Sequence, residues 1–171
     1  MNINHNIEDT DYRYKMPKLE IRLAGRGNGS YTILDNIERV SESLCTPTII
    51  LLNFIARSIG SSANENKKTI TGHYNIEQLT THIYNYIDYF VLCDKCTIPE
   101  LIPTIIGKKK NKNLQMTCSA CGADKILQSG SKLYNKTIEH LIKYYTKNKY
   151  NISKGNIVVK EENDMNCFNP F

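Results

Sequence analysis

The stretch VLCDKC at residues 91–96 is followed, after a gap of 21 residues, by CSAC at residues 118–121, so four cysteines form two Cys-x-x-Cys pairs. Two thiolates separated by two residues can bind one tetrahedral metal ion from a tight turn, and a second pair completes four sulfur ligands at about 2.3 Å. The layout is typical of a zinc ribbon, with a gap slightly above the usual span of about 15 to 20 residues. The sequence therefore predicts one structural Zn²⁺ ion bound by Cys93, Cys96, Cys118 and Cys121.

The same cysteines could instead form a redox pair or two disulfides. Redox motifs occur singly, however, and residues 1–11 contain no apolar, signal-like segment that would direct the chain to an oxidising compartment. A closed four-cysteine site has no open coordination position, so we expect the metal to stabilise a small module rather than to catalyse a reaction. Cys45 and Cys167 lie outside the pairs and are predicted not to bind the metal.

The basic charge is concentrated around the cysteine pairs. The 171-residue chain has a net charge of +5, yet residues 1–90 carry 9 Lys and Arg against 10 Asp and Glu, whereas residues 91–145 carry 9 against 4. The longest apolar run, residues 49–52, is far below the roughly 18 residues that span a bilayer. We therefore expect a cytoplasmic, monomeric protein with no membrane partner and one basic segment.

Hydrophobic periodicity predicts two strands near the start of the chain and one in the middle. Residues 18–24 alternate apolar and polar side chains, which is the pattern of a half-buried strand, and a second short strand runs through Ile33. The polar residues 61–68 are predicted to be a loop, followed by a brief strand at residues 69–72.

Three helices are predicted in the same part of the chain. Asp35 is placed to cap the first of them, and Thr46, followed by Pro47, is placed to cap the second. The third begins at Asn75, and its apolar residues recur at helical spacing up to Phe90, close to the first cysteine pair.

Beyond the ribbon hairpin, residues 125–127 are expected to pair across the sheet, and residues 137–145 to form a closing helix. The predicted fold class is α+β, a small mixed α/β domain followed by a four-cysteine zinc ribbon. Its parts are an N-terminal arm (1–17), the α/β domain (18–90), the ribbon with its helix (91–145) and a loose tail (146–171).

A lysine cluster lies at the expected tip of the ribbon hairpin. It comprises Lys108, Lys109, Lys110 and Lys112. Ammonium groups gathered on a loop can neutralise phosphates and release their counterions, which favours contact with RNA. A solvated loop without a ligand is the alternative.

The stretch GRGNGSYT at residues 25–32 suggests a phosphate-binding loop. Such a loop needs a Lys before its Ser or Thr and a helix after it, whereas here Tyr31 precedes Thr32 and a strand is predicted to follow. The glycines more readily allow positive φ in a hairpin turn. A turn is therefore the favoured interpretation, and the weaker one is nucleotide contact by Gly25, Arg26, Gly27, Asn28, Gly29, Ser30, Tyr31 and Thr32.

The residues YRYKMP at positions 12–17 precede the first predicted strand in a segment without hydrophobic periodicity. This composition predicts an extended arm, with a partly disordered terminus as the alternative. An exposed arginine on a flexible arm meets the physical requirement for an arginine finger, which enters the active site of another protein. Arg13 is therefore a candidate catalytic residue.

Taken together, these motifs resemble a known family. The chain is similar to the N-terminal domain of eukaryotic translation initiation factor five in YRYKMP (12–17), GRGNG (25–29), FVLCDKC (90–96) and CSACG (118–122). The resemblance runs from about Tyr12 to Tyr145. The ribbon is shared with the beta subunit of initiation factor two, whereas YRYKMP and GRGNG resemble factor five in particular.

The resemblance implies a mixed α/β domain and a zinc ribbon that act in the scanning preinitiation complex on the small ribosomal subunit. In that family the domain activates GTP hydrolysis by the gamma subunit of initiation factor two, and the Arg of YRYKMP, here Arg13, is the proposed finger. Lys15 would assist in docking to this GTP-bound partner. The family domain also approaches initiator tRNA, which would suit the basic ribbon tip and Lys67 and Lys68 in the polar loop.

The chain departs from the family pattern at two positions that have been linked to GTPase activation. Tyr31 stands where the family usually has a Lys, and Asn53 stands where it has a basic residue on the helix after Pro47. The loop at residues 60–72 is shorter than is typical, and no segment resembles the family's C-terminal helical-repeat domain. We therefore expect a stand-alone catalytic half.

Two other functions fit the residues. One is a non-catalytic binding module like the beta subunit of initiation factor two, which holds initiator tRNA or the gamma subunit and which the neutral Tyr31 and Asn53 favour. The other is a zinc-ribbon nucleic-acid binder outside translation, supported by the ribbon and its charge alone.

Overall fold

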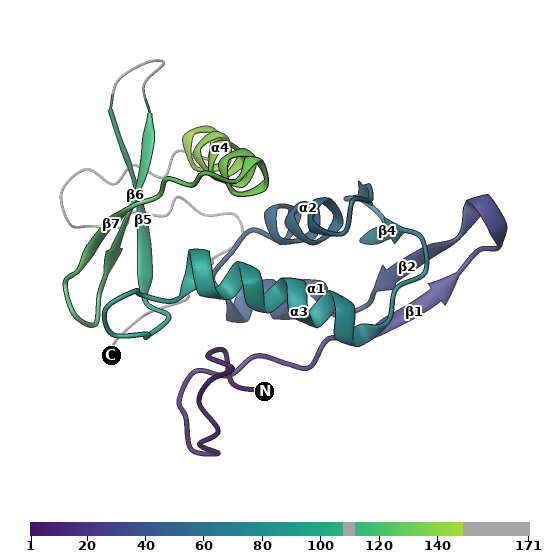
Figure 1. The fold of residues 1–171 in the computed structure, drawn as a ribbon, viewed down its shortest axis with the longest axis horizontal. Helices are drawn as coiled ribbons and strands as arrows, with labels where there is room; N and C mark the ends of the chain where they lie inside the picture. Colours follow the sequence, from purple (N-terminus) through teal and green to yellow (C-terminus); the bar gives the residue numbers. More distant parts are fainter. Residues whose placement is uncertain (108–111, 149–171) are drawn as a thin grey trace. The chain divides into compact units, whose positions relative to one another are not determined.

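The chain divides into two units, Met1–Leu92 and Cys93–Phe171. The computed structural model describes residues 1–107 and 112–148, and the units contain helices and antiparallel sheets of the expected α+β class (Figure 1). Within those described residues, no helix combines the length and the apolar character needed to cross a membrane.

The first unit contains a four-stranded antiparallel sheet with the strand order β1-β2-β4-β3. The strands are β1 (Ile21–Ala24), β2 (Tyr31–Leu34), β3 (Ala63–Asn64) and β4 (Thr69–Thr71). Strand β3 falls within residues 61–68, the segment predicted to be a loop. Its two residues become a strand only because they pair with β4 across the turn, and the polar sequence around them does not indicate this.

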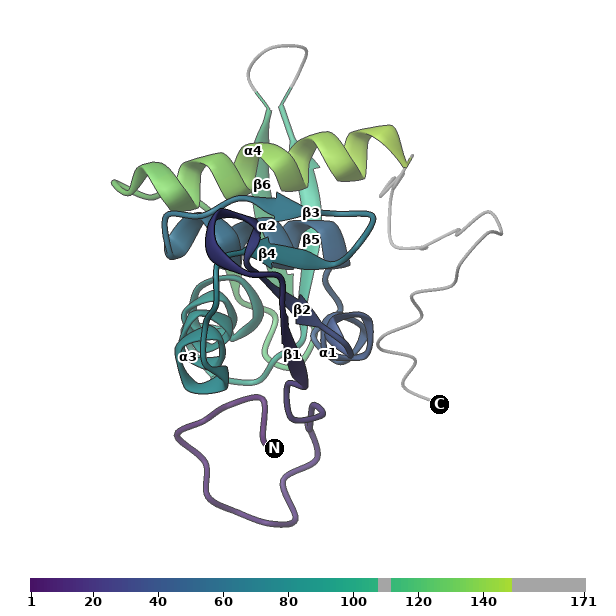
Figure 2. The same ribbon diagram turned by 90° about the vertical axis from the view of Figure 1, so that its right-hand side faces the viewer.

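Three helices complete the first unit: α1 (Ile37–Ser43), α2 (Thr48–Ser58) and α3 (Ile76–Tyr86). Helix α2 contacts both other helices and strands β3 and β4 (Figure 2). Its buried side chains, with Leu34, Ile70, Leu79 and Ile83, are at most 4% exposed and form the core. All three predicted helices are confirmed.

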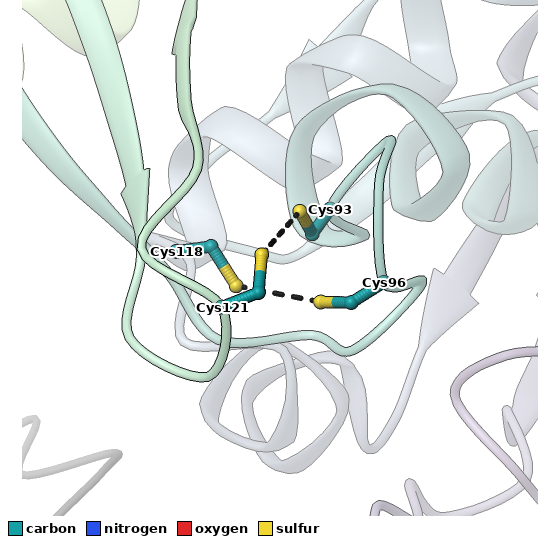
Figure 3. A group of neighbouring side chains, drawn as sticks. All are labelled: Cys93, Cys96, Cys118 and Cys121. Carbon is teal, nitrogen blue, oxygen red and sulfur yellow. Dashed lines mark hydrogen bonds between the residues drawn. The ribbon is translucent and has the colours of Figure 1, made fainter.

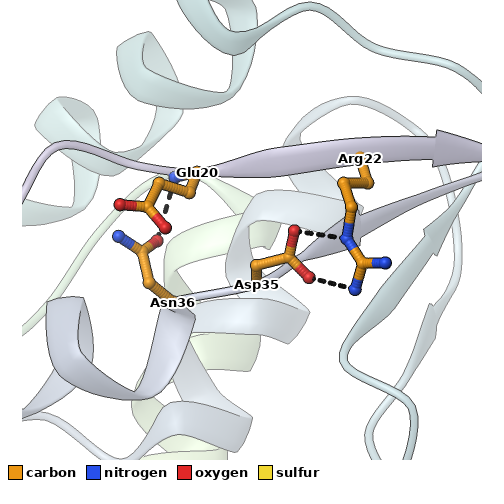
Figure 4. A network of polar contacts seen from close by, with 4 residues as sticks. All are labelled: Glu20, Arg22, Asp35 and Asn36. Carbon is orange, nitrogen blue, oxygen red and sulfur yellow. Dashed lines mark hydrogen bonds and ion pairs between the residues drawn. The ribbon is translucent and has the colours of Figure 1, made fainter.

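The expected cap at Asp35 is wrong, because this carboxylate pairs with a strand instead. Arg22 of β1 donates two hydrogen bonds to Asp35, from Nε to Oδ2 at 2.7 Å and from Nη2 to Oδ1 at 2.6 Å (Figure 4). The neighbouring Asn36 accepts from the Glu20 amide at 2.9 Å and donates to the Lys18 carbonyl at 2.7 Å. The Asn36 side chain thus satisfies the Glu20 amide and the Lys18 carbonyl in place of a neighbouring strand. Strand β1 therefore begins at Ile21, later than predicted.

The expected cap at Thr46 is also wrong. Its hydroxyl is buried and hydrogen-bonds the hydroxyl of Tyr86 on α3, 40 residues away. Burial raises the pKa of Tyr86, and the hydrogen bond to Thr46 opposes this shift only in part. The ring of Tyr86 also stacks against Phe90 at 4.8 Å between centroids.

Helix α3 begins with a capping box in which Asn75 and Gln78 satisfy each other's backbone amides. It continues into a single wide turn, η2 (Ile87–Val91), closed by a hydrogen bond from the Leu92 amide to the Ile87 carbonyl. The buried side chains of this turn keep the end of the helix packed in the first unit.

The second unit contains a three-stranded antiparallel sheet, β5-β6-β7. Its strands are β5 (Leu101–Ile106), β6 (Asn113–Cys118) and β7 (Asp124–Ile126), the last of which confirms pairing across the ribbon although it starts one residue early. Pro103 lies on the edge strand β5, where a missing amide costs least. Helix α4 (Lys132–Lys147) packs along β5 and β6 and is longer than predicted.

Candidate metal centre and N-terminal loop

The four predicted metal ligands lie together at the base of the ribbon (Figure 3). The sulfur atoms of Cys93 and Cys121 are 3.7 Å apart, those of Cys96 and Cys118 are 3.6 Å apart, and all four lie within 4.8 Å of one another. A tetrahedral zinc site with bonds of about 2.3 Å has sulfur–sulfur edges of about 3.8 Å. The four side chains therefore fit one tetrahedral metal ion.

Two matching turns hold the cysteine pairs. In the first, the Thr97 amide donates to the Cys93 carbonyl at 2.8 Å; in the second, the Gly122 amide donates to the Cys118 carbonyl at 2.8 Å. Each first cysteine also donates its own amide to the carbonyl five residues later, at 3.1 Å for Cys93 and 2.9 Å for Cys118. Since Thr97 and Gly122 both have positive φ, of 57° and 70°, the two turns share one backbone conformation.

The two thiols of the first turn differ in acidity. The backbone amide of Ile98 lowers the pKa of Cys96, but burial and the neighbouring cysteines outweigh it and raise this pKa to about 12. Burial raises the pKa of the Cys93 thiol, but the backbone amides of Cys96 and Lys95 outweigh this effect and lower the pKa to about 7. Lys125 of β7 donates to Asp94 at 2.7 Å and ties this turn to the sheet. The donor set is four sulfurs, which suits Zn²⁺ and leaves no position open for a substrate.

Cys45 is not part of this cluster. Cys45 lies in the first unit, just after α1, and is half-buried with a φ of 50°. Cys167 lies outside the described residues, as do most of the predicted tail and Lys108, Lys109 and Lys110.

The residues before β1 are folded back on themselves, so the expected extended arm is wrong. An antiparallel bridge joins Asn2 to Lys15, the Ile3 amide donates to the Tyr14 carbonyl at 3.0 Å, and the Met16 amide donates to the Met1 carbonyl at 2.9 Å. Ile3 and Met16 are 3% and 4% exposed. We call residues 1–17 the N-terminal loop.

The side chain of Asn2 braces this loop from inside. Its Nδ2 donates to the carbonyls of Ile7 at 2.7 Å and Asp9 at 2.9 Å. His5 lies beside α3 and η2, with its ring 4.6 Å from that of Tyr84 and its Nδ1 3.6 Å from Asp88. No pattern in the sequence marks these contacts, because they join residues that share neither a motif nor a periodicity.

Arg13 is exposed on the N-terminal loop. Its guanidinium carbon lies 5.7 Å from the centroid of the Tyr14 ring, and the rings of Tyr12 and Tyr14 are 5.6 Å apart. Burial raises the pKa of Tyr12, whose hydroxyl has no partner in the described part of the chain. Lys15 donates from Nζ to the Thr10 carbonyl at 2.5 Å, so its ammonium holds the loop closed.

The glycine-rich stretch has the geometry of a hairpin turn. It joins β1 to β2, with Ala24 opposite Tyr31, and contains a short turn, η1 (Gly27–Gly29). The amides of Gly29 and Ser30 donate inward, to the carbonyls of Arg26 at 3.1 Å and Gly27 at 3.2 Å. A strand follows, whereas a phosphate-binding loop leads into a helix.

The remaining lysines of the predicted RNA contacts lie in different surroundings. Lys67 is exposed, whereas Lys68 forms an ion pair with Glu38 of α1. Lys112, just before β6, donates to the Thr146 hydroxyl at 3.2 Å. Lys68 is therefore a neutralised charge and the weakest of these candidates.

The two positions that depart from the family pattern carry no positive charge. Tyr31 starts β2 and is 37% exposed. Asn53, on α2, donates to the carboxylate of Glu65 and to the carbonyl of Ile49, each at 2.8 Å.

Comparison with protein families agrees with this arrangement. Residues 4–124 match the family model of the domain found in initiation factors 2B and 5, and this match covers most of the N-terminal loop, the rest of the first unit and the cysteine cluster. The chain belongs to the initiation factor 2B/5 domain family.

Several proteins named as initiation factors are clearly related to this chain. Eukaryotic translation initiation factor 5 of Caenorhabditis elegans is 32% identical over 126 residues, 71% of this chain and 28% of that protein. The factor of the same name from Dictyostelium discoideum is 33% identical over 124 residues, covering 71% and 30%. That of Drosophila melanogaster is 29% identical over 137 residues, covering 78% and 29%. The chain thus spans less than a third of the length of these relatives.

Proposed function

We propose that the protein acts in translation initiation as a factor five-like activator. It would promote hydrolysis of the GTP bound to initiation factor two, on the small ribosomal subunit, when the start codon is selected. Its partners would be the gamma subunit of that factor and initiator tRNA. The observation that carries this proposal is Arg13, exposed on a braced loop in a chain of the initiation factor 2B/5 domain family.

In this proposal Arg13 acts as an arginine finger. Its guanidinium would contact the γ-phosphate and neutralise the charge that develops in the transition state, an effect worth roughly 10³ to 10⁵ in rate for GTPases. The bridge between Asn2 and Lys15 lowers the freedom of the loop before it binds. A guanidinium on a pre-ordered loop loses less entropy on docking than one on an extended arm.

Lys15 serves the same site indirectly. Because its ammonium is bound to the Thr10 carbonyl, we assign it to positioning the loop that docks, with Arg13 two residues away. The four cysteines would hold Zn²⁺, which when bound supplies folding free energy to the second unit and takes no part in hydrolysis.

The test is the rate of GTP hydrolysis by initiation factor two bound to initiator tRNA on small ribosomal subunits. Arg13→Ala is expected to abolish the stimulation while binding to the gamma subunit persists. Arg39→Ala is the matched control, because Arg39 is an exposed arginine on α1 outside the loop. If Arg13→Ala and Arg39→Ala stimulate equally, the finger assignment is wrong.

A second candidate is the non-catalytic binding module like the beta subunit of factor two. The neutral Tyr31 and the engaged amide of Asn53 favour it, since neither offers a cation to a nucleotide. It predicts that the wild-type chain binds the gamma subunit or initiator tRNA without accelerating hydrolysis. A chain that captures no initiation factor or ribosomal protein would instead indicate a nucleic-acid binder outside translation.

A further inference from the structure

Helix α4 carries four exposed lysines on one side. Successive residues of an α-helix are about 100° apart, which places these four within an arc of about 60°. The buried residues of α4, including Ile138 and Leu141, lie on the opposite side and face β5 and β6. We call the exposed set the lysine strip: Lys132, Lys136, Lys143 and Lys147.

Part of the lysine strip works against the stability of its own helix. Lys132 and Lys136 are a like-charge pair four residues apart, as are Lys143 and Lys147, and such pairs destabilise a helix. Lys132 is also the first residue of α4, where the helix dipole disfavours a cation, and the first turn has no acidic residue. Lys147 in the last turn is favoured by the dipole, and Glu139 lies four residues before Lys143, which is a favourable spacing. The like-charge pairs and the cation at the N-terminal end bring the helix no such gain, so the strip points to an external anionic partner.

The strip is long and nearly uniform in charge. From Lys132 to Lys147 it extends about 22 Å at about 1.5 Å per residue. Glu139 lies at its edge, and across the described part of the chain no ion pair joins it to a lysine. The ammonium of Lys112, bound to Thr146, adds a fifth positive charge near the C-terminal end.

We propose that the lysine strip binds the phosphate backbone of helical RNA. The apolar side of α4 is buried against its own sheet, which leaves no face to insert into a membrane. No aromatic residue lies within the arc of the four lysines, and the half-buried His140 lies about 20° beyond Lys147. The strip therefore offers no row of rings on which successive single-stranded bases could stack. Lysines are point charges without the fork of arginine, and they bind phosphates without reading sequence. This surface is separate from Arg13 and does not depend on GTPase activation.

The experiment measures binding of the full chain to an RNA hairpin with a fully paired stem, by fluorescence anisotropy at several salt concentrations. Each lost phosphate contact lowers the slope of log K against log salt by about 0.7 to 0.9. The double variants K132Q/K136Q and K143Q/K147Q are each expected to lower the slope by about 1.5. Glu139→Lys is expected to tighten binding at low salt.

The matched control is K18Q/R39Q, which removes two exposed positive charges from the first unit. It is expected to leave the slope nearly unchanged. Glutamine keeps the helix propensity of lysine and relieves the like-charge pairs, so the α4 variants are expected to melt no earlier than the wild type. Circular dichroism checks this point.

Three outcomes would overturn the proposal. The first is an equal decrease in the salt-dependence slope for the control and the α4 variants, which would mean that RNA is attracted by the overall positive charge and not by the strip. The second is tighter binding to a single strand of poly(U) than to the hairpin. The third is unchanged RNA binding in variants that lose affinity for phosphatidylserine vesicles or an acidic peptide, which would assign the strip to a different partner.

Discussion

Replacing Gly25 by alanine tests whether GRGNG is a hairpin turn with a steric requirement. Gly25 has a φ of 77°, and a Cβ built there would lie 2.0 Å from the Gly29 carbonyl oxygen and 2.8 Å from its carbon. An L-residue in this conformation costs about 1–2 kcal/mol. The overlap forces the backbone to move as well, and such strain costs about 1–3 kcal/mol more.

The control is Gly27→Ala in the same turn. Gly27 also has a positive φ, of 54°, but nothing lies within 4 Å of a Cβ built at this position. Alanine reduces the entropy of the unfolded chain similarly at both sites, and this term cancels in the comparison. Gly25→Ala should therefore be less stable than Gly27→Ala by about 2 kcal/mol, which follows from the overlap alone.

The assay is thermal unfolding of the chain with Zn²⁺ present in the buffer, followed by circular dichroism. A difference of about 2 kcal/mol corresponds to about 8–16 °C in the melting temperature of a unit of this size. Equal melting temperatures for the two variants would refute the prediction, because the expected difference comes only from the overlap of the Gly25 Cβ with Gly29.

Three further predictions concern the metal centre, the Arg22–Asp35 pair and the N-terminal loop. Elemental analysis should find one zinc per chain, and changing Cys93 and Cys118 to serine should remove it and unfold the second unit; a folded, metal-free wild type would contradict this. Asp35→Asn should lower the unfolding midpoint at pH 7 but not at strongly acidic pH. The hydrogen bonds from Arg22 lower the pKa of Asp35 in the folded state, so this stabilisation is present above the unfolded pKa and is lost as the pH falls through the folded one. Asn2→Ala removes two hydrogen bonds worth about 0.5–1.5 kcal/mol each, and hydrogen exchange should show faster exchange of the loop amides, while unchanged exchange would mean that Asn2 does not brace the loop.

Local patterns in the sequence predicted most elements. Periodicity placed three helices in the first unit, and the Cys-x-x-Cys spacing identified the four sulfurs that cluster in the second. The predicted caps failed because Asp35 and Thr46 have partners 13 and 40 residues away, Arg22 and Tyr86. A capping motif reflects only the backbone amides of the next few residues. A hydrogen-bond partner from a distant part of the chain can bind the same side chain instead.

The fold of the N-terminal loop also depends on contacts between residues far apart in the sequence. YRYKMP identified Arg13, but the fold of the loop depends on the bridge between Asn2 and Lys15 and on the burial of Ile3 and Met16, which no periodicity marks. The motif thus supplied a candidate arginine, and the tertiary contacts decided how its loop is folded.

The sequence by itself determined which four cysteines cluster, because a pair of cysteines two residues apart closes its own turn and needs little from the rest of the chain. Only the tertiary structure decided that four lysines of α4 form one exposed strip. Their spacing was present in the sequence, but which side of the helix meets water depends on which side Ile138 and Leu141 bury against β5 and β6. Helical geometry gives the four lysines a common side, but packing decides whether that side is exposed, and the function of a surface depends on its exposure.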